Sequence, residues 1–161
     1  MNLGFKKKHK DSHLASNPVA RFKYLITETI EVGIVLQGTE VKSIRNTSPH
    51  LRDAYVQMKA SAKNKQLEAW LLNAYIGPYS HGNRYNHESI RPRKLLLHAE
   101  QLRKFDALTR QKGYSIVPLK MYLKRGLIKL EIGLGKGKKE HDKREALKKK
   151  ALERDAAQER N

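Results

Sequence analysis

The sequence predicts a mainly β domain with a few helices, followed by a basic tail. Apolar and polar residues alternate through about six short segments, as half-buried antiparallel strands require. Two of these segments flank Lys124-Arg125-Gly126, a turn typical of a β-hairpin. The alternation stops at Leu134, where a run of glycines and cations begins. Short strands in a domain of about 115 residues favour a small closed antiparallel barrel of the OB type, an architecture that binds nucleic acids.

The first part of the chain divides into four segments. Residues 1–17 are polar and cationic, and we expect a basic N-terminal arm that is disordered in the free protein. Residues 21–27 and 30–36 alternate, and each is predicted to form a strand. Residues 38–45 change to a spacing of three, which predicts a short helix with one apolar and one cationic side.

The second part of the chain is predicted to alternate between strands and longer connections. Residues 54–59 and 67–74 are predicted as strands, and 102–108 as a helix that ends near Gly113. Residues 119–134 contain the predicted hairpin. Residues 77–94 have no clear period, and an irregular stretch of that length in a compact domain is usually functional or disordered.

The tail has the composition of a helix but no apolar face. Helix-forming residues dominate from Glu140 onward, yet the few apolar residues are scattered around the helix axis. A helix without an apolar stripe gains little by docking on its own domain. We therefore expect a tail that is disordered in isolation and helical inside an RNA-lined channel; the alternative is a solvated, frayed end. The predicted organisation is an arm at 1–17, a barrel at 18–135 and a tail at 136–161.

The charge of the chain indicates the class of its partner. The formal net charge is +18 over 161 residues, and +14 of it lies in residues 1–135, so the folded body is basic without the tail. Lysine and arginine dispersed over a domain favour nucleic acid, because phosphate neutralisation releases counterions. The absence of an apolar N-terminal run or of a long apolar segment predicts a cytosolic protein with no membrane partner.

No residue pattern indicates catalysis or a cofactor. The chain has no cysteine, and its seven histidines lack the spacing of a metal site. Residues 133–139 are rich in glycine and lysine but lack the Walker pattern. Glu31 and Glu40 lie among cations, where a carboxylate either forms a surface ion pair or accepts hydrogen bonds from RNA. We expect neither an enzyme nor a cofactor.

Aromatic and cationic side chains are interleaved in the irregular segment 77–94. Rings stack on unpaired bases, and guanidinium groups contact phosphate, so this mixture suits unstacked nucleotides at a bend. The alternative is that the two tyrosines, Tyr79 and Tyr85, pin the loop to the barrel. The rings and cations concerned are Tyr79, His81, Arg84, Tyr85, His87, Arg91, Arg93 and Lys94.

Four segments together carry a family resemblance. They are GIVLQGTEVKS at 33–43, GNRYNH at 82–87, RPRKLLL at 91–97 and KGKKEHDKRE at 136–145. In their order and spacing they resemble the SmpB family, whose members bind transfer-messenger RNA (tmRNA) in bacterial trans-translation, and the similarity covers roughly residues 17–150. The resemblance implies an OB-like barrel without catalytic activity that binds the tRNA-like domain of tmRNA. It also implies delivery with elongation factor Tu and GTP to stalled 70S ribosomes, where the tail lies at the decoding centre of 16S rRNA in the empty mRNA channel.

The resemblance assigns candidate residues to two sites. The expected tmRNA-facing residues are Asn17, Glu31, Gln37, Glu40, Lys42, Ser43 and Arg45, with Arg91, Arg93 and Lys94 as supporting phosphate contacts. The expected decoding-centre residues are Lys138, Lys139, His141, Asp142, Lys143 and Arg144. The alternative function is a general OB-type ribosomal or translation-initiation protein that binds RNA directly; an RNA-processing enzyme is disfavoured because no catalytic constellation is present.

Overall fold

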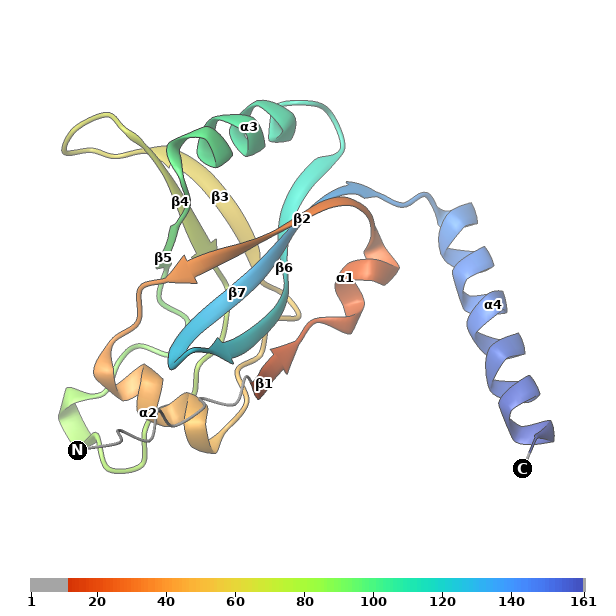
Figure 1. The fold of residues 1–161 in the computed structure, drawn as a ribbon, viewed down its shortest axis with the longest axis horizontal. Coiled ribbons are helices and arrows are strands. Elements are labelled where there is room, and N and C mark those ends of the chain that lie inside the picture. Colours follow the sequence, from red (N-terminus) through yellow and green to blue (C-terminus); the bar gives the residue numbers. More distant parts are fainter. Residues whose placement is uncertain (1–11, 161) are drawn as a thin grey trace, which may run out of the picture.

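The computed structural model describes residues 12–160, which form a β-sheet body and a projecting C-terminal helix (Figure 1). The elements in chain order are β1 (Ser12–Ser16), α1 (Pro18–Lys23), β2 (Tyr24–Ile34), α2 (Gly38–Asn46), β3 (Tyr55–Ala60), β4 (Leu67–Leu72), the 3-10 turn η1 (Asn83–Tyr85), β5 (Arg93–Leu96), α3 (Ala99–Thr109), β6 (Tyr114–Lys124), β7 (Leu127–Gly137) and α4 (Glu140–Glu159). The mainly β class with a few helices is therefore confirmed.

The strands of the described part pair antiparallel, in the order β1-β6-β3-β4-β5-β2-β7. β6 also pairs with β7, so the pairings lead from β6 through β3, β4, β5, β2 and β7 back to β6. β1 pairs with β6 farther along that strand. Every strand of this ring thus has a hydrogen-bonded neighbour on each side, which removes exposed edges over the paired stretches.

The predicted hairpin is confirmed as β6 and β7. Lys124 lies opposite Leu127, so the connection has two residues. These are Arg125 (φ 51°) and Gly126 (φ 81°), and positive φ at both positions is the property of the type I′ turn that suits twisted hairpins. Side chains from opposite walls of the body meet in the larger of two hydrophobic clusters, which includes Val32, Leu71, Ile116, Met121 and Leu130.

Two predictions for the N-terminal region are wrong. Residues 12–16 form β1 on the edge of β6, so this part of the predicted disordered arm belongs to the sheet; residues 1–11 of the arm lie outside the described part of the chain. The strand predicted at 21–27 is helical at 21–23, within α1 (18–23), and residues 24–34 form one long strand, β2, instead of two separate ones. Pro18 lies at the start of α1, where its fixed φ and missing N–H favour a helix over a strand.

The tail forms the helix α4, which extends away from the body (Figure 1). β7 continues to Gly137, two residues beyond the predicted boundary at 135, so the separate tail begins at Lys138. No residue of α4 is buried over 140–159. This agrees with the scattered apolar pattern, and the disorder expected for the tail of the free protein stays a prediction.

Candidate nucleic-acid interface

The helix α2 divides its side chains between the core and solvent. Its first turn is stabilised because Glu40 Oε1 accepts the Gln37 N–H at 2.8 Å, a contact typical of a helix N-terminus. Glu40, Ser43 and Ile44 point inward and are buried. Lys42 and Arg45 are exposed on the opposite side, as the three-residue spacing predicts. The helix therefore presents cations to solvent while its acidic group faces the body.

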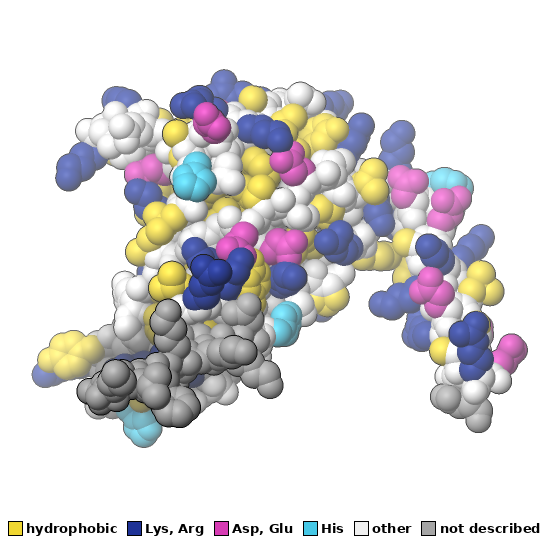
Figure 2. Space-filling view, in the orientation of Figure 1, with side chains coloured by type: hydrophobic (Ala, Val, Ile, Leu, Met, Phe, Trp, Pro, Cys, Tyr) yellow, Lys and Arg dark blue, Asp and Glu magenta, His cyan; other side chains and the backbone are white. Residues whose placement is uncertain are grey.

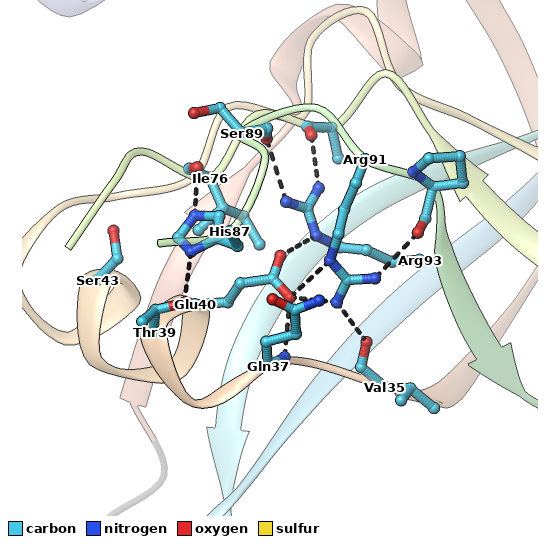
Figure 3. Close-up of polar contacts among 12 residues, drawn as sticks. Val35, Gln37, Thr39, Glu40, Ser43, Ile76, His87, Ser89, Arg91 and Arg93 are labelled. Carbon is cyan, nitrogen blue, oxygen red and sulfur yellow. Dashed lines mark hydrogen bonds and ion pairs between the residues drawn. The ribbon is translucent and has the colours of Figure 1, made fainter. Parts of the chain in front are cut away.

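Glu40 is the centre of a buried ion-pair cluster (Figure 3). Its carboxylate pairs with the guanidinium groups of Arg91 and Arg93, and the side chains of Glu40 and Arg93 have no exposed surface. Arg93 also donates to the Ala74 carbonyl at 2.7 Å and to the Ser89 carbonyl at 3.1 Å. Each side of the Arg93 fork is thus occupied by the protein itself.

The cluster holds Glu40 in its charged form. Burial alone raises the pKa of Glu40, but hydrogen bonds from the Gln37 N–H, Arg91 and Arg93 outweigh it, and the pKa lies below its ordinary value of 4.5. Burial lowers the pKa of Arg93, and the Glu40 carboxylate opposes that shift. A buried pair of this kind is costly to break from one side, because the remaining charge stays buried without a partner.

Further contacts attach the loop at 76–92 to α2. Ser43 Oγ donates to the Gly77 carbonyl at 2.6 Å. His87 is buried between Thr39 Oγ1 and the Ile76 carbonyl, each 2.9 Å from a ring nitrogen. Because a carbonyl only accepts, the ring nitrogen Nε2 carries a proton. We call residues 37–46 and 76–93 the α2–loop unit; they comprise α2 with the preceding Gln37, and the loop with Arg93 at the start of β5.

The structure corrects three sequence-based expectations within the α2–loop unit. Glu40 and Arg93 cannot contact RNA directly, because their side chains are fully buried and their polar atoms are bonded within the protein. His87 is buried and cannot stack on a base. Arg91 keeps 19% of its side chain exposed. The role that the geometry gives Glu40, Arg93 and His87 is to position the exposed residues around them.

Two other predicted residues, Lys94 and Glu31, lie outside this unit. Lys94, in β5, is 42% exposed and pairs with Glu68 at 3.2 Å. Glu31, in β2, accepts a hydrogen bond from the Tyr122 hydroxyl and pairs with Lys124 at 3.2 Å. The Tyr122 contact lowers the pKa of Glu31. Glu68 and Glu31 thus each form an ion pair with a lysine, which is the common role of a carboxylate among cations.

Asn17 is a buried junction residue. Its Nδ2 donates to the Pro118 carbonyl at 2.9 Å, and its backbone N–H donates to the Leu119 carbonyl at 2.8 Å. It therefore connects the β1–α1 turn to β6, and its side chain is not hydrogen-bonded to the α2–loop unit. Asn17 Oδ1 is buried and has no hydrogen-bond partner among residues 12–160.

The tail is attached to the body through Lys138. Its backbone N–H donates to the Lys23 carbonyl, and its ammonium donates to the Arg21 carbonyl, both at 2.9 Å. These carbonyls belong to the end of α1, where a helix favours a cation. Asp142 Oδ2 accepts the Lys139 N–H at 3.2 Å and so caps the start of α4. Two of the six predicted decoding-centre residues therefore have roles within the protein.

The remaining predicted tail residues present charge along α4. His141 pairs with Glu145 at 3.0 Å, and Lys143 pairs with Glu140 at 3.6 Å. Arg144 is exposed. Figure 2 shows Lys and Arg side chains along α4 as well as over the body. Both regions thus offer cations to a polyanion.

Sequence reasoning missed an exposed apolar patch next to the hairpin turn. Leu96 is 55% exposed and Leu127 is 62% exposed. Together with Val41 they line a groove of about 280 Å³. The exposure of Leu96 could have been predicted from the sequence, because successive residues of a strand point to opposite faces and the neighbouring Leu95 is buried. The position of Leu127 beside it depends on the folded sheet.

The described part of the chain shows neither a metal site nor a membrane-spanning helix. Residues 12–160 contain no group of three or more His, Asp or Glu side chains placed to hold a metal ion. None of the helices in this range is long and apolar enough to cross a membrane.

Comparisons with known proteins give one consistent result. A family model described as "SmpB protein" matches residues 14–161. The "SsrA-binding protein" of Staphylococcus aureus strain JH1 is 52% identical over 151 residues, which cover 94% of each chain. The same protein of strain Newman has the same identity and coverage. A solved chain from "tmRNA-SmpB: a journey to the center of the bacterial ribosome" is 39% identical with a TM-score of 0.63, covering 84% of this chain and 95% of that one.

Proposed function

Because the chain belongs to the SmpB family, we propose that it is the tmRNA-binding adaptor of trans-translation. It binds the tRNA-like domain of tmRNA, delivers this RNA to stalled ribosomes, and places its tail in the decoding centre and the empty mRNA channel. The result is ribosome rescue and peptide tagging. One observation carries this proposal: the match extends from β1 through the α2–loop unit to the end of the tail.

The body supplies the tmRNA site in this proposal. The exposed residues Lys42 and Arg45 of α2 and the partly exposed Arg91 provide cations for phosphate. The predicted site also includes Gln37, Lys94 and Glu31. Two further members are buried and act as supports: Ser43 holds the loop at Gly77, and Asn17 holds the β1–α1 turn against β6. Glu40 and Arg93 do not contact the RNA; from inside the protein they hold Arg91 and the loop in position. The ring of paired strands serves as an OB-like barrel that holds these elements in place.

The tail supplies the ribosomal site. Lys139, His141, Lys143 and Arg144 face 16S rRNA, while Lys138 and Asp142 set the start and direction of the helix. The complex reaches the ribosome together with elongation factor Tu and GTP, in the cytoplasm. The tail of the free protein is disordered and becomes helical in the channel, because α4 buries no residue against the body.

Competition binding tests the proposal. Labelled tRNA-like domain of tmRNA is bound to the protein at about 0.15 M salt, where non-specific phosphate contacts are weakened, and an excess of ordinary tRNA is added. Retained binding is the expected result. Complete displacement would contradict it and would favour the alternative, a general OB-type ribosomal or translation-initiation protein.

A further inference from the structure

The tip of the loop in the α2–loop unit carries aromatic and cationic side chains that the proposed sites do not use. Tyr85 is 75% exposed. The Arg84 guanidinium lies 5.1 Å from the centre of the Tyr85 ring, and Arg84 Nη2 donates to the Tyr85 hydroxyl at 3.2 Å. The contact with Arg84 orients the Tyr85 ring, and most of the surface of that ring stays exposed to solvent. An exposed, oriented ring of this kind is a stacking platform.

A second group of rings lies at the base of the same loop. The Tyr79 and His81 rings meet edge to face with their centres 5.4 Å apart. The Lys42 ammonium lies 5.6 Å from the centre of the Tyr79 ring, so the exposed face of α2 continues into the loop. Residues 77–92 contain one acidic residue, Glu88, which follows the buried His87. The tip therefore combines rings with positive charge.

The backbone of the tip is held in place before any ligand binds. Asn86 bonds to both sides of Tyr79: its Oδ1 accepts the Tyr79 N–H at 2.9 Å, and its Nδ2 donates to the Tyr79 carbonyl at 2.7 Å. A Cβ on Gly82 would lie 2.7 Å from Asn86 Nδ2, so a larger residue here would require the Asn86 amide to shift from its position against Tyr79. The buried contacts of His87 and Glu40 then anchor the loop to α2. A fixed platform loses little entropy when a ligand is ordered on it.

We propose that Tyr85, supported by Arg84, stacks on an unpaired RNA base while Lys42 contacts a neighbouring phosphate. The chemistry favours single-stranded RNA, because a flat ring needs an open base face, which a duplex hides. The proposal deepens the proposed function, since it assigns a stacking subsite to the RNA-binding body.

The test measures binding of the full-length protein to a fluorescein-labelled ten-nucleotide adenine RNA at about 0.15 M salt, beside a ten-base-pair RNA duplex. Tyr85→Ala is expected to weaken single-strand binding about 5-fold or more, as loss of a base stack does, with little change for the duplex. Tyr85→Phe keeps the ring and should bind like the wild type. Tyr55→Ala is the control, because Tyr55 is another exposed tyrosine (43%) that lies on β3, outside the loop.

The salt dependence separates stacking from charge. Tyr85→Ala should leave the slope of log affinity against log salt unchanged, whereas Lys42→Gln should reduce it by about 0.7 on a single strand. Unchanged single-strand affinity of Tyr85→Ala, or an equal loss for the duplex, would overturn the proposal and leave the tip as a surface for a protein partner. These oligonucleotides include neither tmRNA nor the ribosome, so a failure here is distinguishable from displacement in the competition experiment.

Discussion

The α2–loop unit and the tail carry the same kind of charge, yet they are held in opposite ways. The α2–loop unit is fixed by a fully buried ion-pair cluster around Glu40 and by Ser43 and His87. The tail is attached through Lys138 and buries none of its residues over 140–159. A surface that recognises one folded RNA benefits from rigidity. A segment that enters a channel benefits from freedom to adopt its shape there.

Removing the tail is the sharpest way to separate the two regions. A chain that ends after Lys139 keeps all of β7 and the Lys138 contacts with α1. The removed residues carry seven cations and six acids, a net charge of +1. Affinity for the tRNA-like domain should therefore stay within about twofold, while peptide tagging on stalled ribosomes should be lost. Tagging assays and RNA binding on the same preparation check this; surviving tagging would contradict the role of the tail.

Breaking the buried cluster should have the next largest effect. Glu40→Gln keeps the shape of the side chain but leaves Arg91 and Arg93 without their carboxylate. We expect a loss of about 3–5 kcal/mol in the free energy of unfolding, measured by urea titration. Glu28→Gln is the control, since Glu28 forms a partly exposed pair with Lys104 and its loss should cost less than about 1 kcal/mol. Equal losses in the two variants would refute the special position of Glu40.

Acid should reduce the difference between Glu40→Gln and the wild type. The pKa of Glu40 is below 4.5 in the folded protein, so its contribution is fully present above pH 4.5 and is lost as the pH falls below that value. The difference in unfolding free energy between the two proteins should therefore shrink between pH 7 and about pH 3. A difference that stays constant over this range would show that Glu40 does not act through its charge.

Lys138→Met should loosen the tail without affecting the body. The substitution removes the ammonium from the Arg21 carbonyl, a contact that contributes about 1 kcal/mol. Since the chain has no cysteine, Thr47→Cys on the body and Ala156→Cys on α4 provide two unique labelling sites. The distribution of spin-label distances should broaden in Lys138→Met. Lys139→Met, which removes the same charge one residue later, should leave the distribution as it is in the wild type, and identical distributions in both variants would argue against the anchor.

Much of the molecule could be predicted because its signals are local. The three-residue spacing of α2, the Arg125-Gly126 turn and the cationic tail each depend on neighbouring residues. The prediction failed at residues 12–23, where β1 needs β6 as a partner more than a hundred residues away and Pro18 favours a helix over the alternating pattern. At the candidate site, chain position suggested which cations lie near α2 but not which of them are exposed.

By itself, the sequence determined a basic, mainly β protein with a separate charged tail, because composition and periodicity act over a few residues. The tertiary structure decided which charges are available to a ligand. Glu40 and Arg93 are 53 residues apart, and only the folded sheet buries them together while Lys42 on the same helix stays exposed. The physical reason is that burial depends on contacts between distant segments, which no local pattern encodes.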